Sequence, residues 1–423
     1  MSTRKTLGFW SCWALMVGIM IGTGIFILPT LLAPYGLLSL AGWTMTATGS
    51  LLLALIIARL SSRTERSGGV YVFAHDAFGE LPGFLMGWSF WASYWISIPV
   101  VAIGFVAYLG VFFPSLETSP VAQAGVALAL IWILTLINMK SLKGASVSQL
   151  IMTLLKIVPL LLVLILGIVS GDSANFPRES PTDISVIKGV ATAALLTMWA
   201  FVGLEAGSIP ASDVREPRRT IARATIFSVL TVAVIYIGST IAVMRLVPTE
   251  ILLESTSPYA DAAKQLGAWG PYLIGVGVLI SAAGALNGII FVAGQMPMAL
   301  AIDGLAPRVF ATRGERGAPY ISLLLGSGLG SILLLTNYTK GLVGAYTFLA
   351  MMGTLTALVP LLVSVAADAK YSWRSEKTWL AVALFAALYS IFAILGSGIE
   401  VLAWGSLLFL LGVPVYFLIK RAT

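Results

Sequence analysis

Apolar runs long enough to cross a bilayer recur from one end of this chain to the other. A membrane-spanning helix needs about 20 consecutive apolar residues. Charged residues make up only 10% of the 423 residues, whereas soluble domains carry about 25%. We therefore predict one all-α membrane domain of about twelve membrane-spanning helices, over the approximate ranges 7–32, 36–59, 80–113, 119–138, 146–169, 187–211, 224–246, 269–302, 319–337, 341–366, 378–396 and 400–419.

The distribution of basic residues predicts which side each loop faces. If the N-terminus is cytoplasmic, 19 of the 25 lysines and arginines fall in cytoplasmic segments, five lie on the opposite side, and Lys156 lies inside a span. Because positive residues concentrate in cytoplasmic loops, we predict a multi-pass protein of the inner cell membrane with both termini in the cytoplasm. The net charge of +7 does not form one patch, so membrane lipids are expected partners and nucleic acid is not.

Two ionisable residues are predicted at membrane depth, Lys156 in the fifth span and Glu205 in the sixth. A charged side chain that faces lipid there costs about 2.5–3.5 kcal/mol or more, so both are expected to face a cavity. A single cysteine and a single histidine leave no cluster of the kind that holds a metal ion. Neither a metal nor a cofactor is expected.

The first and sixth spans carry residues that interrupt a helix. The first contains Gly-Thr-Gly at 22–24, and the sixth contains two glycines, Gly203 and Gly207, within the run 199–207. Freed backbone groups at mid-membrane are tolerated only where they line a cavity or meet a ligand. Two interrupted spans, each the first of a group of five, are typical of an inverted-repeat transporter. The alternative is that these glycines only allow close packing between helices.

The ends of the broken helices indicate how a substrate would be held. Half-helix N-termini present free N–H groups that suit an α-carboxylate, and C-termini present free carbonyls that suit an α-ammonium group. The candidate substrate-binding residues in the two breaks are Ile21, Gly22, Thr23, Gly24, Ile25, Ala200, Phe201, Gly203 and Glu205.

Short motifs along nearly the whole chain resemble the amino acid–polyamine–organocation superfamily, in particular its bacterial amino-acid antiporters of the arginine/agmatine type. Their order and spacing carry the resemblance: GTGIF at 22–26, SGG at 67–69, WAFVGLE at 199–205, REPRR at 215–219, SPYADAA at 257–263 and DGLAP at 303–307. The resemblance implies two inverted five-helix repeats, within 1–170 and 186–366, followed by two further helices in 367–423.

The same resemblance implies roles for two residues of the sixth span. Trp199 would close over the substrate as a gate, and Glu205 would be a proton-sensitive residue tied to the transport path. Two plainer alternatives stay open: Trp199 as an ordinary packing aromatic, and Glu205 as an anchor hydrogen-bonded across helices.

Other positions depart from the arginine/agmatine pattern. The eighth span has Ile289, after Asn287, where those antiporters carry an aromatic lid, and the third span has Ser97 near the position of a polar substrate contact. A guanidinium group favours flat aromatic faces and several acceptors, and this pocket is poorer in both. These features favour neutral L-amino acids.

The fifth and eighth spans also favour neutral L-amino acids. Lys156 and the residues around Ser281 resemble the pattern of proton-dependent amino-acid permeases and L-amino-acid exchangers. We expect Lys156 to find acceptors among the freed carbonyls of the first span, around Gly18 to Gly22, and at the Ser281 hydroxyl. Lys156, Ser281 and Glu205 are therefore candidate coupling residues, with Lys156 either a switch or a permanently charged strut.

The predicted function is secondary active transport of amino acids by alternating access, as sodium-independent exchange or proton-coupled transport of neutral L-amino acids. The alternatives are an antiporter of cationic amino acids or polyamines and an amino-acid sensor built on a transporter fold. An enzyme is not expected, because the predicted spans offer one acid, one amine and scattered hydroxyls. A channel is disfavoured because it does not need two matched broken helices. A homodimer is left open.

Overall fold

The computed structural model describes residues 7–64, 66, 68–116, 118–140, 145–177, 185–208, 214–314, 317–337, 340–373 and 376–422, with only the backbone described for Lys140, 145–152 and Ala422. Some residues used in the sequence predictions lie outside this set, namely Arg4, Lys5, Ser67, Lys143, Arg178, Arg316 and Arg374.

Helices account for all the regular structure in the described residues. In the described part of the chain, ten helices are long and apolar enough to cross a membrane, and α1 with α2 forms one further span that is bent by 42°. The shorter helix α8 ends at the sixth-span break. The bounds are α1 Phe9–Met20, α2 Gly24–Leu32, α3 Leu38–Arg63, α4 Val70–Phe78, α5 Glu80–Leu109, α6 Pro120–Lys140, α7 Ala145–Ser170, α8 Val186–Trp199, α9 Pro217–Leu246, α10 Thr249–Glu254, α11 Pro258–Ala262, α12 Gly270–Ile302, α13 Tyr320–Asn337, α14 Gly341–Ser372, α15 Lys377–Leu395 and α16 Gly398–Ala422.

These elements confirm an all-α membrane protein whose first and sixth spans are broken. Each predicted span overlaps a helix, or a helix and its break, and the largest difference at a helix end is seven residues, at the start of α9. The two inverted repeats stay a prediction.

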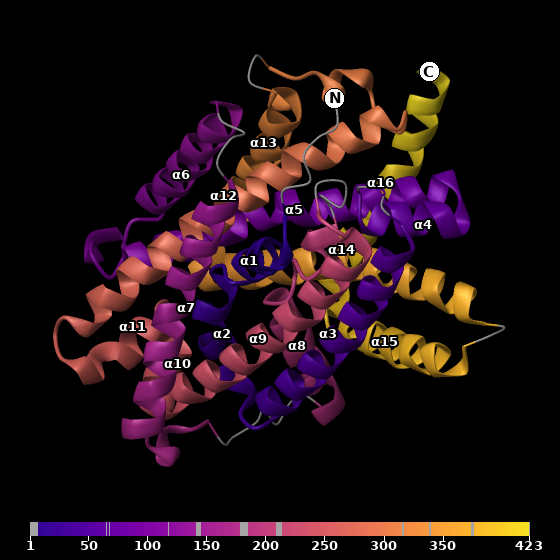
Figure 1. The fold of residues 1–423 in the computed structure, drawn as a ribbon. Coiled ribbons are helices and arrows are strands. Elements are labelled where there is room, and N and C mark those ends of the chain that lie inside the picture. The colour runs from indigo at the N-terminus through magenta and orange to yellow at the C-terminus, as the bar shows by residue number, and fades with distance from the viewer. Residues whose placement is uncertain are drawn as a thin grey trace.

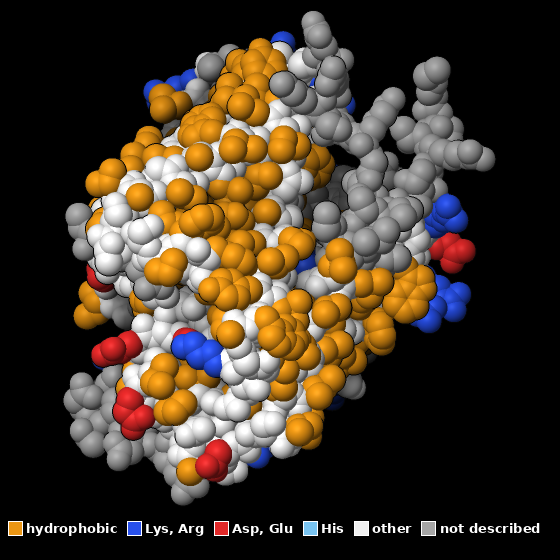
Figure 2. Space-filling model, turned by 90° about the vertical axis from the view of Figure 1, so that its left-hand side faces the viewer, with side chains coloured by type: hydrophobic (Ala, Val, Ile, Leu, Met, Phe, Trp, Pro, Cys, Tyr) orange, Lys and Arg blue, Asp and Glu red, His pale blue; other side chains and the backbone are white. Residues whose placement is uncertain are grey.

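The outer surface of the bundle is apolar. Figure 2 shows hydrophobic side chains over most of one face, with few charged side chains among them. Large apolar residues remain exposed on the peripheral helices, including Ile168 on α7 and Leu395 on α15, which are 69% and 68% exposed. Patches of this kind on a chain with membrane-length helices are the surface that faces lipid.

The broken first span lies at the centre of the bundle. Figure 1 shows α1 and α2 surrounded by α5, α8, α9 and α14. The helix α1 packs against α7, α9 and α12, while α3 packs against α8 and α9. Residues of both breaks are therefore enclosed by helices that come from distant parts of the sequence.

Hydrogen bonds join α2 to its neighbours at the end of the bundle where α2 contacts the short helices α10 and α11. The Thr30 hydroxyl donates to the Ser255 carbonyl at 2.9 Å. The Tyr108 hydroxyl donates to the Phe26 carbonyl at 2.7 Å and accepts from the Tyr259 N–H at 3.2 Å. Helix α2 is thus tied both to α5 and to the loop that covers it.

Candidate functional site

The first break exposes backbone carbonyls, and neighbouring helices satisfy them. Helix α1 ends at Met20, and Ile21 leaves the helical region with ψ at 78°. The Tyr236 hydroxyl donates to the Met20 carbonyl at 2.6 Å, and the Ser281 hydroxyl donates to the Ile21 carbonyl at 3.1 Å. One turn earlier, Lys156 Nζ donates to the Gly18 carbonyl at 2.7 Å. Side chains from α7, α9 and α12 therefore cap the C-terminal end of α1.

The N-terminal end of α2 is different. Thr23, Gly24 and Ile25 carry N–H groups of the first turn, which have no acceptor inside the helix. Thr23 precedes the helix, and its side chain makes no capping hydrogen bond within the described chain. The positive end of the α2 dipole and the first-turn N–H donors therefore face the space beside Gly24.

The second break is a run of tight turns. Successive N–H groups bond three residues back, as in Phe201 to Met198 and Val202 to Trp199, rather than four as in an α-helix. Gly203 has φ at +111°, a region that favours glycine. A Cβ atom at this position would lie 2.6 Å from Ile19 Cγ2, so the two breaks also touch here.

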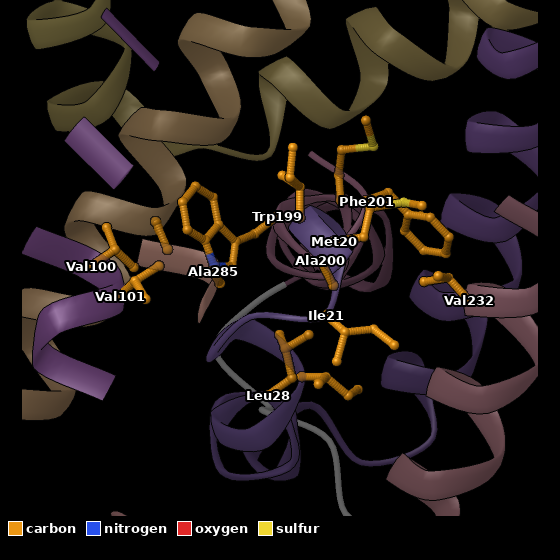
Figure 3. Close-up of a cluster of buried hydrophobic side chains, with 14 of the residues drawn as sticks. Met20, Ile21, Leu28, Val100, Val101, Trp199, Ala200, Phe201, Val232 and Ala285 are labelled. Carbon is orange, nitrogen blue, oxygen red and sulfur yellow. The ribbon is translucent and has the colours of Figure 1, made fainter. Parts of the chain in front are cut away.

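The turns of the second break send its aromatic residues to opposite sides. Figure 3 shows the Trp199 indole pointing toward Val101 while the Phe201 ring points toward Val232. The Phe201 ring packs edge-on against Trp43 and Tyr236. Trp199 thus faces the space between the breaks, and Phe201 faces the surrounding core.

Glu205 is buried, with 1% of its surface exposed. The N–H groups of Gly203 and of Glu205 itself are its nearby donors, yet neither carboxylate oxygen has a partner with hydrogen-bond geometry in the described residues. The Tyr94 hydroxyl is close enough to interact with the Glu205 charge and likewise has no partner in the part of the chain that is described. Two polar groups are therefore held unpaired at the same depth, where an unpaired buried group is unfavourable.

A small cavity lies between the two breaks and α5. Its volume is about 30 Å³, room for one or two water molecules and far below the roughly 300–1,000 Å³ of a typical ligand pocket. It is lined by Ile19, Met20, Gly22, Thr23, Gly24, Ser93, Tyr94, Ser97, Val101, Trp199, Val202 and Ile289. The structure is thus a closed form of the molecule.

The cavity gathers six of the predicted substrate-binding residues: Gly22, Thr23, Gly24, Ser97, Trp199 and Ile289. Other predicted residues lie beside it with different contacts. The Asn287 amide oxygen accepts from Asn138 on α6 at 2.8 Å. Ile21, Ile25, Ala200, Phe201, Gly203 and Glu205 are buried, outside the lining of the cavity.

Sequence reasoning missed the other half of the lining: Ile19, Met20, Ser93, Tyr94, Val101 and Val202. Helical spacing could have found part of it, because Ser93 and Val101 lie four residues on either side of Ser97 and so share its face. The Ser97 hydroxyl donates to the Ser93 carbonyl at 2.5 Å, which leaves its lone pairs available to the cavity.

The predicted coupling residues surround the C-terminal end of α1. Lys156 is 1% exposed, and its stem passes Gly284 of α12, where a Cβ atom would lie 3.2 Å from Lys156 Cε. One helical turn away on α7, the Thr153 hydroxyl donates to the Ala14 carbonyl at 2.9 Å. Together with Ser281, these contacts join α7 and α12 to α1. Glu205 belongs to the second break and is not part of this cluster.

The two helix ends at the first break differ in their free hydrogen-bonding groups. The carbonyls of the first break are engaged by side chains, while the first-turn N–H groups of α2 are not capped within the described residues. Such an arrangement suits an anionic group at the start of α2.

Comparison with known proteins agrees with this architecture. The profile of the family described as amino acid permease matches residues 7–416. The chain is 30% identical to the cadaverine/lysine antiporter of Escherichia coli strain K12, over 84% of this chain and 82% of the relative. It is 29% identical to a putative arginine/ornithine antiporter of Bacillus subtilis, over 99% and 96% of the two chains. It is also 28% identical to the putrescine transporter PotE of Haemophilus influenzae, over 94% and 93%.

These relatives are transporters, and the match extends over nearly the whole chain and both broken spans. The chain is an amino-acid transport protein of the membrane and belongs to the amino acid permease family.

Proposed function

We propose that this chain is a sodium-independent antiporter that binds the backbone of an amino acid between its two broken spans. The observation that carries the proposal is the uncapped start of α2, where Thr23 and Gly24 line the closed cavity beside Trp199. An α-carboxylate would satisfy the first-turn N–H donors of α2 and the helix dipole together. Movement of Trp199 would admit the substrate and enlarge the cavity.

For the substrate class, the names of the relatives favour a cationic amino acid or polyamine. The related proteins are named for cadaverine and lysine, arginine and ornithine, or putrescine. Glu205 supports this class, because a substrate ammonium group in its neighbourhood would give the unpaired carboxylate a charged partner. We therefore place cationic substrates ahead of the neutral amino acids that the sequence alone favoured.

Neutral amino acids remain a second candidate on one specific observation. Of the described residues that line the cavity, none is charged, and Ile19, Val101, Val202 and Ile289 make much of its wall apolar. A branched aliphatic side chain would fill such a wall without leaving a buried charge.

For coupling, we propose that Lys156 takes the place of a bound cation between α1, α7 and α12. Its ammonium group, with the Ser281 hydroxyl, holds the carbonyls at the end of α1. Loss of the proton would release α1, whereas a permanent charge would make Lys156 a strut. We also propose that both termini are cytoplasmic, because the basic residues favour that side.

Counterflow in proteoliposomes tests the function. Vesicles loaded with one unlabelled compound would be offered tritiated L-lysine, L-arginine, cadaverine, putrescine or L-leucine. An antiporter accumulates label only when a substrate is present inside, saturably and equally in sodium and choline buffers. Binding of a compound without any flux would indicate a sensor, and flux of L-leucine alone would replace the cationic assignment by the neutral one.

A further inference from the structure

The Trp199 indole fits into a slot whose two ends are glycines. A Cβ atom on Gly24 of α2 would lie 2.9 Å from Trp199 Cδ1 and 3.1 Å from Nε1. At the far end of the ring, a Cβ atom on Gly353 of α14 would lie 2.9 Å from Trp199 Cζ3. Real side chains do not approach so closely, so only glycine at both positions lets the indole lie between α2 and α14. We call this space the indole slot.

A single hydrogen bond fixes the indole within the slot. Trp199 Nε1–H donates to the Tyr346 hydroxyl at 3.1 Å. Tyr346 lies on α14, two turns before Gly353, and is 1% exposed. Its hydroxyl is 3.7 Å from the position of a Cβ atom on Gly24. The hydroxyl therefore sits where the start of α2, the end of α8 and α14 come together.

We propose that Tyr346 and Gly353 are positioning residues that keep Trp199 over the start of α2 in this closed form. The inference rests on the proposed placement of the substrate carboxylate at that helix end. In this form the indole occupies part of the volume that a substrate needs, and binding must move it out of the slot. The strength with which α14 holds the indole then sets part of the apparent affinity, because a binding-competent form that is rarely populated weakens binding in proportion.

Changes at the two residues should act in the same direction. Tyr346→Phe keeps the ring but leaves the buried Trp199 N–H without its acceptor, which destabilises the seated indole. The indole then leaves the slot more readily, and substrate affinity rises by about two- to tenfold, the range of one buried hydrogen bond. Gly353→Ala adds a methyl group where the ring lies, so the indole no longer fits the slot and affinity likewise rises, by about tenfold as expected for touching groups.

The test is binding of tritiated L-lysine, or tritiated L-leucine if the counterflow panel selects a neutral side chain, to purified protein in detergent. Tyr389→Phe is the matched control, because it removes another buried tyrosine hydroxyl, on a residue that does not line the cavity. The parent, Tyr346→Phe and Tyr389→Phe are compared for affinity and for the change in tryptophan emission on binding. Tighter binding by Tyr346→Phe alone, with an altered emission change, supports the proposal. Equal affinity in all three overturns it.

A double-mutant cycle keeps the proposal testable if Tyr346→Phe does not fold. Gly353→Ala is made in the parent and in a Trp199→Phe background, where the shorter ring leaves the α14 end of the slot empty. A gain of affinity that disappears in the Trp199→Phe background shows that Gly353 acts through Trp199. The same gain in both backgrounds, or no gain in the parent, shows that it does not. If the parent itself binds none of the offered compounds, the proposed function fails instead.

Discussion

Lys156 Nζ lies 2.7 Å from the carbonyl oxygen of Gly18, one turn before the first span breaks. The side chain reaches this carbonyl from α7 and is almost fully enclosed. A buried ammonium group is tolerated only where acceptors surround it. The contact therefore gives the lysine a definite place near the end of α1, where the Tyr236 and Ser281 hydroxyls donate to the carbonyls of Met20 and Ile21.

Replacing Lys156 should separate binding from turnover. In Lys156→Ala, the Gly18 carbonyl loses its donor, which we expect to destabilise the protein by about 1–3 kcal/mol. The cavity does not include Lys156, so substrate affinity should be kept while counterflow slows or stops. Lys156→Met tests whether filling the space without charge restores the rate, and exposed Lys188→Ala is the control. Normal exchange by Lys156→Ala would rule out both the switch and the strut.

The pH dependence of exchange distinguishes the switch from the strut. A lysine that must lose its proton in each cycle gives the parent a pH-dependent exchange rate that is absent from any residual activity of Lys156→Met. A permanently charged strut gives parent and variant profiles of the same shape. The measurement is initial counterflow rate in proteoliposomes with equal pH on both sides.

Sodium should have no effect on transport. The Lys156 ammonium group already supplies a positive charge at a carbonyl of the broken span, so we expect no bound cation to be required there. Initial rates of exchange should be equal when choline replaces sodium at constant ionic strength. A saturable stimulation by sodium would show that the amine does not take over this role.

Gly24→Val should abolish substrate binding without preventing folding. Its Cβ atom would lie 2.9 Å from the Trp199 ring and would crowd the first-turn N–H groups of α2. The matched control is Gly328→Val on α13, where the described residues leave open space within 4 Å of a new Cβ atom. Both variants should elute as folded protein in detergent, and only Gly328→Val should bind substrate. Binding by Gly24→Val would move the carboxylate site elsewhere.

The sequence predicted the breaks and a carbonyl acceptor for Lys156 because both follow from local or energetic rules. Glycine pairs weaken a helix wherever they occur, and an ammonium group in the membrane requires acceptors. In the structure, the Gly18 carbonyl is such an acceptor for Lys156. The Ser281 hydroxyl, expected as a second acceptor for Lys156, instead donates to the Ile21 carbonyl.

Side-chain directions inside the second break could not be read in the same way. The turns bond three residues back, so the helical spacing that predicts shared faces no longer applies. Phe201 consequently faces Trp43.

Contacts between residues distant in sequence could not be predicted either. The partner of Asn287, Asn138, lies 149 residues away in sequence. Tyr346 likewise accepts a hydrogen bond from Trp199, which lies 147 residues away in sequence. No local sequence motif predicts either contact.

Glu205→Gln should reveal the substrate class. The change keeps the size of the side chain but removes the charge that an ammonium group would pair with. Affinity for L-lysine, L-arginine or cadaverine should fall by about tenfold or more, since hydrogen bonds to charged groups contribute about 1.5–3 kcal/mol. Affinity for L-leucine should change little. Glu254→Gln, at an exposed glutamate on α10, is the control. Unchanged lysine affinity would place Glu205 outside the substrate path.

The stability of the protein should depend on a buried ion pair between α3 and α14. Arg59 Nη1 on α3 lies 3.1 Å from Asp368 Oδ2 on α14 and also donates to the Ser372 hydroxyl at 2.7 Å. The arginine contacts Glu376 as well, and its guanidinium group lies 4.5 Å from the centre of the Trp379 ring. The Asp368 side chain is fully buried, so Arg59→Met should destabilise the protein by about 3–5 kcal/mol because it leaves this charge uncompensated.

The double variant decides whether the uncompensated charge is the cause. Arg59→Met with Asp368→Asn removes both charges, and its thermal unfolding in detergent should occur at a higher temperature than that of Arg59→Met alone. Lys340→Met is the surface control, because Lys340 pairs with Glu400 where both side chains are exposed by 39% and 63%, and such pairs contribute about 0–1 kcal/mol. If the double variant is no more stable than Arg59→Met, the loss comes instead from the packing of Arg59 against Trp379 and its contacts with Ser372 and Glu376.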